Sequence, residues 1–392
     1  MEEALERRRF ISTFGRRLRL AFVGGASRSS IGEVHRVASR IDGMFETVAG
    51  VFSSDPHRSR EIALGEGIDE DRAYATWSDL ISKEYQRKDR ADVLSVMTPN
   101  DSHFDICSAA LKAGFDVICD KPLTTSLGSS LRLLSMSRSF DRVLAVTYCY
   151  SGYPLVRQAR AMVRDGAIGE IRQVHVQYVQ GWAVETNLTS WRFNREQVGG
   201  SSILIDLGTH AFHLAAFVTG LAARQVIADL DNTVPGRVSD DYGAVLLKYE
   251  NGACGTIWLT SAAPGSEHGL LFRIFGDKGG LEWVQENPNV LTYMRRGDFA
   301  QMITRRKSPL MTAAALQQTR TEIGHPEGYL EAFANIYSDV AWQIASREGV
   351  DITDIIEPDF PDARDGVAGL AFVEAAMESA ASRTWQTIKV MS

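Results

Sequence analysis

The chain has 392 residues, of which 44% are hydrophobic and 23% charged, and its formal net charge is −7. This length and composition fit a globular protein with two domains, and the negative charge is atypical of nucleic-acid-binding proteins. No apolar stretch approaches the length that a bilayer-spanning helix needs. The protein is therefore expected to bind neither nucleic acid nor membrane.

The N-terminal residues are rich in arginine. Arg7, Arg8 and Arg9 are followed by Arg16, Arg17 and Arg19, with no long apolar segment behind them, so a secretory signal is not predicted and a solvated arm is expected. The four cysteines form no C-x-x-C pair, which predicts neither a zinc site nor a redox motif and suits the cytoplasm. Three of them, Cys107, Cys119 and Cys254, lie in apolar stretches and are expected to be buried.

Strands and helices alternate over residues 18–149. Apolar runs predict strands at 18–23, 47–52, 91–98, 117–119 and 142–148, and helices are expected from about residue 31 and at 77–85, 103–113 and 127–137. Such alternation predicts a doubly wound parallel sheet covered on both faces, the arrangement of a dinucleotide-binding Rossmann domain.

Residues 150–392 have a different pattern. Val174, Val176 and Tyr178 alternate with polar residues, and Asn251-Gly252 separates two apolar runs as in a hairpin. Gly279-Gly280 is interpreted in the same way. With helices expected at 156–165, 210–219, 329–347 and 367–382, this half is predicted to be an α+β domain with a largely antiparallel open sheet. Its strands are too apolar for full exposure, so a homodimer or homotetramer through this sheet is expected.

The first strand ends in Gly24-Gly25, and Gly32 follows after a longer loop than the usual G-x-G-x-x-G pattern has. A Rossmann domain places glycine where the backbone approaches a pyrophosphate at a helix N-terminus. Gly24, Gly25, Ser29, Ile31 and Gly32 are the predicted contacts. Taken alone, the motif favours an ordinary strand-to-helix turn equally.

The second strand ends in Ser53-Ser54 and not in the acid that contacts the ribose of NAD. Serine with the nearby Arg58 suits the 2′-phosphate of NADP, while Asp55 is placed to reach a ribose. A solvated side chain is an equally good interpretation of Arg58. Either NAD or NADP is therefore open as the cofactor.

Two further polar groups follow strands of the same sheet. Thr98, Pro99, Asn100 and His103 follow the 91–98 strand at the sheet edge where ligands bind in open α/β folds, although Asn100 is also suited to cap a helix. Asp120-Lys121-Pro122 ends the next strand. A lysine there can donate to a substrate oxygen, and the proline is compatible with a cis bond. The competing interpretation is a surface ion pair next to a turn.

The densest polar cluster in an apolar frame lies at residues 199–210. Asp206 and His210 are four residues apart and share one face if helical, so that a carboxylate can orient an imidazole base. A capped helix with a core histidine is the alternative. No third ligand accompanies these residues at recognisable spacing, so no metal is expected.

These pieces occur together and in order, and from residue 18 onward the chain resembles the glucose–fructose oxidoreductase/inositol dehydrogenase family (Gfo/Idh/MocA). The lysine motif E-K-P appears as Asp120-Lys121-Pro122, P-N-x-x-H as Pro99 to His103, and D-x-G-x-H as Asp206 to His210. The resemblance implies that Lys121 supports a proton relay, His210 is the general base and Asp206 binds a substrate hydroxyl.

The chain departs from the family pattern at two places. The acid that often ends D-x-G-x-H-x-x-D is His213 here, and the glycine loop differs. Residues 147–157 and 325–329 are similar to inositol-dehydrogenase-like members. The resemblance implies a substrate site of Tyr148, Trp191 and Arg192 with Lys121, Asp206 and His210.

The predicted function is an NAD(P)-dependent oxidoreductase that moves a hydride between the nicotinamide and a ring hydroxyl of a sugar, inositol or related polyol. Two alternatives remain open at this point. One is a nucleotide-binding regulatory protein on the same fold. The other is a glycoside-processing enzyme that oxidises its substrate transiently and recycles NAD.

Overall fold

The structure is a computed structural model that describes residues 9–26, 30–305, 311–353, 355 and 357–389. The chain divides into two compact units. The first contains residues 1–124, 128–152 and 329–366, and the second contains residues 125–127, 153–328 and 367–392. Each unit is described by itself.

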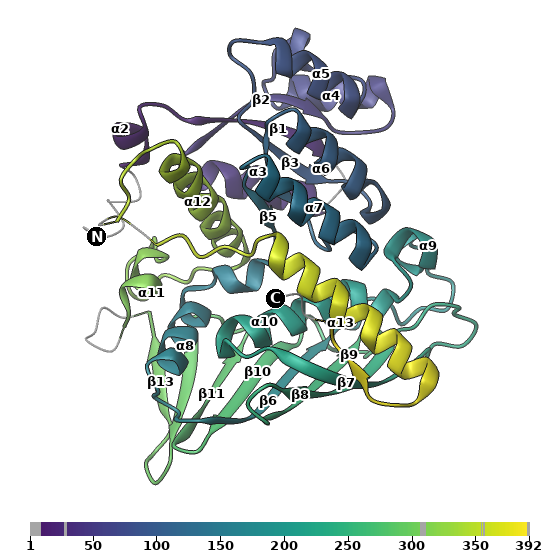
Figure 1. The fold of residues 1–392 in the computed structure, drawn as a ribbon, viewed down its shortest axis with the longest axis vertical. Coiled ribbons are helices and arrows are strands. Elements are labelled where there is room, and N and C mark those ends of the chain that lie inside the picture. Colours follow the sequence, from purple (N-terminus) through teal and green to yellow (C-terminus); the bar gives the residue numbers. More distant parts are fainter. Residues whose placement is uncertain (1–8, 27–29, 306–310, 354, 356, 390–392) are drawn as a thin grey trace. The chain divides into compact units, whose positions relative to one another are not determined.

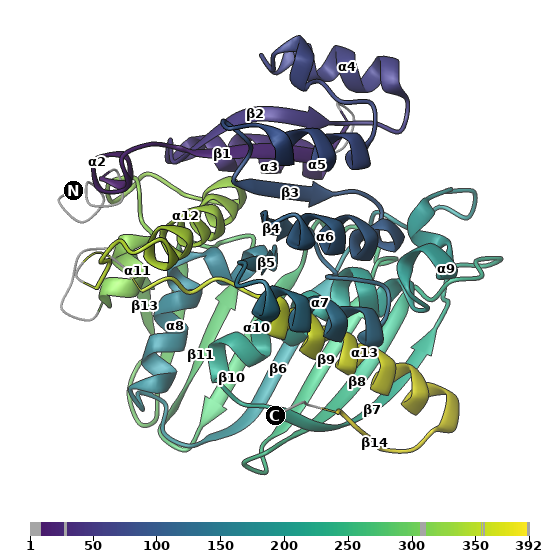
Figure 2. The ribbon, with the colours of Figure 1, turned by 45° about the horizontal axis from the view of Figure 1, so that its top comes forward.

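The described residues of the first unit form a five-stranded parallel sheet in the order β2-β1-β3-β4-β5 (Figure 2). Its strands are β1 (Leu18–Gly24), β2 (Phe45–Val51), β3 (Val93–Met97), β4 (Asp116–Cys119) and β5 (Leu144–Val146). Its helices are α2 (Phe10–Phe14), α3 (Ser30–Ile41), α4 (Pro56–Gly65), η1 (Glu70–Arg72), α5 (Trp77–Gln86), η2 (Asn100–Ser102), α6 (His103–Lys112), α7 (Leu127–Ser139), η3 (Cys149–Gly152) and α12 (Tyr329–Arg347). The predicted Rossmann topology is confirmed. The strand order reverses between β1 and β3, which is where such folds bind nucleotides.

Alternate residues of each strand face opposite sides of this sheet. Val23, Val96 and Cys119 belong to the core cluster that includes residues of α5, α6 and α7. Ser95, the neighbour of Val96, faces the other side and is hydrogen bonded to Tyr337 of α12. The sheet therefore has α5–α7 on one face and α12, with α3, on the other.

Helix α12 has the bounds that the sequence predicts, but the division into units differs from the single boundary expected after residue 149. Its large residues Phe333, Tyr337 and Trp342 are fully buried, and it packs on α3 and η3 of the first unit. Burying such side chains contributes about 2 kcal/mol each. Helical periodicity identifies an apolar helix but not the sheet against which it packs, so the sequence assigns α12 to residues 150–392 while the helix packs within the first unit.

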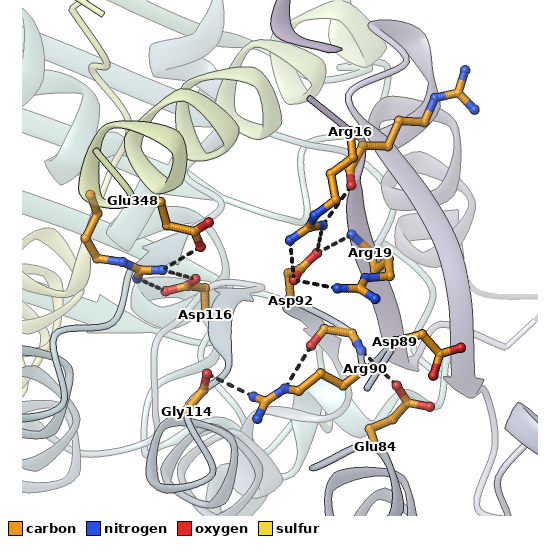
Figure 3. Close-up of polar contacts among 12 residues, drawn as sticks. Arg16, Arg19, Glu84, Asp89, Arg90, Asp92, Gly114, Asp116 and Glu348 are labelled. Atoms are coloured by element: carbon orange, nitrogen blue, oxygen red, sulfur yellow. Dashed lines mark hydrogen bonds and ion pairs between the residues drawn. The ribbon is translucent and has the colours of Figure 1, made fainter. Parts of the chain in front are cut away.

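The arginines among the first 19 residues are not all part of a solvated arm. Arg16 and Arg19 both pair with Asp92, which precedes β3, and Asp92 also accepts from the backbone N–H of Arg19 (Figure 3). Arg7 and Arg8 lie outside the described residues. Nearby, Arg90 donates to the carbonyl oxygens of Ala113 and Gly114 at the end of α6. The pairs with Asp92 hold the start of β1 against the start of β3, and Arg90 holds the end of α6 beside them.

The described residues of the second unit form a nine-stranded sheet in the order β13-β12-β11-β10-β6-β9-β8-β7-β14. The strands are β6 (Ile171–Val179), β7 (Ala223–Asp231), β8 (Tyr242–Tyr249), β9 (Cys254–Thr260), β10 (Leu270–Gly276), β11 (Gly279–Val284), β12 (Val290–Arg295), β13 (Gln301–Thr304) and β14 (Gln386–Thr387). The helices are α8 (Pro154–Arg164), η4 (Trp191–Phe193), α9 (Arg195–Val198), the π-helix η5 (Leu204–Gly208), α10 (Thr209–Thr219), α11 (Ala313–Gln317) and α13 (Ala363–Ser382). The sheet is antiparallel except for the parallel pair β6–β9, so the predicted largely antiparallel sheet is confirmed.

Helices α8, α10 and α13 lie over one face of this sheet (Figure 1). On the opposite face Leu246 of β8 and Trp258 of β9 remain 49% and 41% exposed. Cys254 is on that face too and is exposed, so the expectation that it is buried is wrong. The hairpin register assigns Cys254 to the outside while its neighbours Ala253 and Gly255 face the core.

Among the described residues, none of the helices combines the length and the apolar character that a transmembrane segment requires.

Candidate active site

The turn after β1 is built from glycines that pack closely against neighbouring backbone. Gly24 and Gly25 have φ angles of 93° and 72°. A Cβ on Gly24 would lie 2.7 Å from the carbonyl oxygen of Met97, and one on Gly25 would lie 2.9 Å from the Cα of Gly32. Only glycine satisfies both the angles and the spacing. This arrangement fits a dinucleotide pyrophosphate, which needs close backbone approach at a helix N-terminus.

The same turn is held by a residue that the sequence analysis did not single out. Arg36 of α3 is buried and donates to the carbonyl oxygen of Gly25 at 2.5 Å. Ile31 lies half-buried in the first turn of α3, and Ser29 lies outside the described residues. Arg36 lies four residues after Gly32, so helical spacing offered a signal for its position.

The end of β2 carries the groups predicted to contact the ribose. Asp55 caps α4, because its carboxylate accepts from the backbone N–H groups of His57 at 2.9 Å and Arg58 at 3.3 Å. Its own N–H donates to Ser53 Oγ. Ser54 and the Arg58 side chain are exposed. The nearby acid is thus engaged at a helix cap, and Ser53 is the second residue after the strand.

The groups after β3 and β4 are tied together by His103. One ring nitrogen lies 2.9 Å from the carbonyl oxygen of Thr98, and the other lies 2.8 Å from that of Pro122. His103 is fully buried, so it joins the two loops that carry Pro99-Asn100 and Lys121. Asn100 is also buried, and Ser102, not Asn100, occupies the N-cap of α6.

Asp120 and Lys121 follow β4, and the Lys121–Pro122 bond is cis. Oδ1 of Asp120 accepts from the Lys121 backbone N–H at 2.9 Å and from Thr147 Oγ1 at 2.8 Å. Burial by itself raises the pKa of the Asp120 carboxyl, but His35, Lys121 and Thr147 outweigh it and hold that pKa well below its usual range. Asp120 is therefore a carboxylate, and a surface ion pair does not describe it.

In the second unit, Asp206 lies in the π-helical turn η5, and His210 lies in the first turn of α10, which continues it. The sequence predicts a helix only from residue 210, whereas in the structure Asp206 is helical too. Such π turns are frequent at functional sites. The Asp206 side chain is 26% exposed and faces Arg192 Nε at 3.6 Å. His210 is largely buried, with its ring 6.2 Å from that of Tyr178.

Three residues near His210 were not proposed from the sequence. Tyr178 Oη lies 2.8 Å from Nε2 of His268, and Gln180 Nε2 lies 3.4 Å from the other nitrogen of that ring. Burial lowers the pKa of His268, and Glu286 and Asp206 oppose this shift. The alternation in β6 that buries Val174 and Val176 also turns Tyr178 inward, so that pattern was the available signal.

The remaining predicted substrate residues differ in exposure. Trp191 is 38% exposed, and the Arg192 guanidinium lies 4.9 Å from its ring centroid. Tyr148, in contrast, has no exposed surface, and its role in substrate binding stays a prediction. His213 is buried, and burial together with Arg160 lowers its pKa to about 3. No cluster of metal ligands occurs within the described part of the chain.

Two family models match the sequence. "Oxidoreductase family, NAD-binding Rossmann fold" matches residues 18–148, and "GFO/IDH/MocA C-terminal domain" matches residues 156–282. The uncharacterized oxidoreductase YfiI of Bacillus subtilis is 33% identical over 372 residues, which cover 93% of this chain and 94% of YfiI. Levoglucosan dehydrogenase of Pseudarthrobacter phenanthrenivorans is 27% identical over 76% of this chain and 80% of its own.

Among solved structures, an inositol dehydrogenase homolog of Azotobacter vinelandii complexed with NAD+ is 36% identical and superposes with a TM-score of 0.91. The match covers 95% of this chain and 97% of that one. The same homolog complexed with NADH and myo-inositol has a TM-score of 0.89 over the same shares of the two chains.

Proposed function

This chain belongs to the GFO/IDH/MocA family of oxidoreductases with an NAD-binding Rossmann fold, and we propose that it oxidises a ring hydroxyl of a sugar, inositol or related cyclic polyol. One observation carries the proposal. The carboxylate–imidazole pair Asp206/His210 and the Lys121 motif stand in a chain 36% identical, over 95% of its length, to an inositol dehydrogenase homolog complexed with NADH and myo-inositol.

The first unit supplies the cofactor site in this proposal. The proposed contacts are the backbone of Gly24, Gly25 and Gly32, the Ser53 side chain, and the Thr98–Asn100 loop. They lie beyond the carboxyl ends of β1, β2 and β3, which are neighbours in one sheet. NAD, when bound, supplies the hydride acceptor. His103 and Arg36 hold the loops in this proposal: the His103 ring nitrogens face the carbonyl oxygens of Thr98 and Pro122, and Arg36 donates to the carbonyl oxygen of Gly25 and pairs with acidic side chains.

The second unit supplies the base. His210 takes the proton of the reacting hydroxyl, since an imidazole exchanges protons near neutral pH. Asp206, which keeps part of its carboxylate exposed, accepts a hydrogen bond from a substrate hydroxyl. Tyr178, whose ring packs against that of His210, limits the orientation of the imidazole. The Lys121 ammonium donates to a substrate oxygen.

The test uses purified protein with NAD+ or NADP+ and a panel of inositols, aldoses, glycosides and anhydrosugars, and follows the absorbance of the reduced nicotinamide. A dehydrogenase accumulates reduced cofactor in step with the oxidised product. Product without net reduction indicates transient oxidation with recycled NAD. Cofactor binding without turnover on any member of the panel indicates a regulatory protein. Either of these results contradicts the proposal.

We also propose that the outward face of the large sheet is covered by a second copy of the chain, as a homodimer or homotetramer in the cytoplasm. Leu246 and Trp258 leave apolar surface on that face, and the four cysteines are free thiols, which suits a reducing compartment. Light scattering during gel filtration measures the mass. We expect a dimer or tetramer, which Trp258→Glu weakens, and a wild-type monomer would contradict the assignment.

A further inference from the structure

Three polar side chains form a buried cluster in the first unit, and one of them, His35, lies next to Asp120. They come from different elements: His35 from α3, Ser95 from β3 and Tyr337 from α12. His35 and Ser95 have no exposed surface, and Tyr337 is 1% exposed. Burying polar groups costs free energy unless they are hydrogen bonded, and apolar residues would fill the same space without that cost. The cluster therefore calls for a reason other than packing.

The hydrogen bonds of the cluster favour a His35 ring whose Nδ1 accepts and carries no proton. Tyr337 Oη lies 2.8 Å from His35 Nδ1 and 2.8 Å from Ser95 Oγ, and Ser95 Oγ itself lies 3.3 Å from the same Nδ1. Burial raises the pKa of the Tyr337 hydroxyl, so Tyr337 remains a neutral phenol. The other ring nitrogen of His35, Nε2, lies 3.9 Å from Oδ1 of Asp120. A bare Nε2 lone pair would face a carboxylate unfavourably. In the favoured tautomer Nδ1 accepts from the Tyr337 hydroxyl at 2.8 Å, with Ser95 Oγ at 3.3 Å as the more distant second donor, and Nε2 carries the N–H on the side of Asp120.

Asp120 connects this cluster to Lys121. Oδ1, the oxygen nearest His35, is also the one that accepts from the Lys121 backbone N–H and from Thr147. A carboxylate fixed from both sides fixes the backbone at which the Lys121 side chain begins. At 3.9 Å the imidazole does not make a direct hydrogen bond to Oδ1, so it acts on the carboxylate through electrostatic attraction.

A proton relay to solvent does not explain the cluster. Beyond His35 the chain of hydroxyls ends at Ser95 and Tyr337, both of which are buried. A proton that enters there has no exit through these groups. Orientation of Asp120, and not transport of protons, is the role that this geometry supports.

We propose that His35 is a positioning residue for the reaction: held in one tautomer by Tyr337 and Ser95, it orients the Asp120 carboxylate and thereby the Lys121 side chain. The inference rests on the proposed function, since it presumes that Lys121 acts on the substrate. If the inference holds, turnover also depends on α12, because the Tyr337 hydroxyl of that helix holds His35.

The kinetic test compares two replacements of His35. His35→Phe keeps the ring volume, which packs edge-on against Phe333, and removes the donor. His35→Gln keeps an N–H donor near the position of Nε2. Because displacing a catalytic group by roughly 1 Å can cost about 100-fold, we expect His35→Phe to lower kcat about 10-fold or more. The KM values and the affinity for NAD should stay within about twofold, and His35→Gln should restore most of kcat.

Tyr337→Phe removes a single hydroxyl and covers the case in which His35→Phe does not fold. It should lower kcat in the same direction with unchanged KM. The inference is overturned if folded His35→Phe or Tyr337→Phe retains wild-type kcat, or if His35→Gln loses as much as His35→Phe.

A spectroscopic arm does not depend on activity. Correlation of ring protons with 15N in histidine-labelled protein distinguishes the two neutral tautomers, and His35→Gln identifies the His35 signals. We expect a proton on Nε2 in wild type and a mixture of tautomers in Tyr337→Phe. A proton on Nδ1 in wild type overturns the inference. If wild type turns over no member of the panel, the proposed function has failed, and the tautomer alone then decides the assignment of His35.

Discussion

His210 lies in the second unit, on the same helical run as Asp206, whereas the proposed cofactor contacts belong to the first unit. Its replacement therefore tests base chemistry separately from cofactor binding. We expect His210→Asn to lower kcat about 100-fold or more, because that is the usual contribution of a general base. NAD affinity, measured by fluorescence titration, should be unchanged, since the glycine turn is untouched. His175→Asn, on the outward side of β6, is the matched control and should keep full activity. Near-normal turnover in His210→Asn would remove His210 from the base role.

Cofactor choice depends on the end of β2. Ser53 has no carboxylate to repel a 2′-phosphate, and Asp55 is engaged at the cap of α4. We therefore expect wild type to bind both NAD and NADP, and Ser53→Asp to weaken NADP binding and spare NAD. Asp55→Asn keeps a good helix cap and removes the charge. If Asp55→Asn, and not Ser53→Asp, changes the preference in titrations, the ribose lies closer to Asp55 than we propose.

His213 makes stability depend on pH. Its pKa is lowered to about 3 by burial and Arg160, whereas an unfolded histidine titrates near 6.5. Between these values the unfolded chain binds more protons, so the contribution of neutral His213 is present above about pH 6.5 and is lost as the pH falls toward about 3. Urea unfolding should show a smaller loss of stability between about pH 7 and about pH 5 in His213→Asn than in wild type. Equal losses would show that His213 titrates normally.

The roles of single residues were only partly predictable from their neighbours in the chain. Glycine at the turn, the lysine motif and the Asp206/His210 pair were identified because each has a fixed spacing. Cys254 was misjudged because exposure depends on which face of an element is covered, and an apolar stretch does not specify that. The partners of His35 come from residues 95 and 337, which no local pattern connects.

At the scale of elements, the start of the helix that carries Asp206 and His210 is held by a carboxylate from the loop before β8. Asp240, which precedes β8, accepts from Ser201 Oγ, from the Ser202 N–H at 3.0 Å and from the Ile203 N–H at 3.3 Å. It therefore acts as an N-terminal cap supplied from outside the helix. Residues 199–210 predicted a capped helix start, but the capping carboxylate is some forty positions along the chain.

Removing this cap should weaken the second unit. We expect Asp240→Ala to lower the free energy of unfolding by about 1–2 kcal/mol, since buried N–H groups lose their acceptor. The exposed Asp229→Ala in β7 is the control and should change it by less than about 0.5 kcal/mol. Chemical denaturation measures both. A loss in Asp240→Ala no greater than in the control would show that Asp240 does not stabilise the helix.

At the scale of the whole molecule, local patterns predicted the elements better than their partners. Hairpins such as β8–β9 join neighbouring strands, and their turn residues report the pairing directly. In the parallel pair β6–β9, two other strands, β7 and β8, lie between the partners in sequence, so no turn motif indicates the pairing. The same reasoning applies to α12, whose bounds were predicted and whose place in the first unit was not.

The most direct test of the proposed oxidation follows the hydrogen that leaves the substrate carbon. A cyclic polyol that the enzyme oxidises in the panel is supplied with deuterium on its ring carbons, together with unlabelled NAD+. The mass of the recovered cofactor is then measured by mass spectrometry. We predict one deuterium in the reduced cofactor of wild type, and a rate of its appearance in His210→Asn about 100-fold lower. Reduced cofactor without deuterium, or product that forms while the cofactor stays oxidised and unlabelled, would contradict the account.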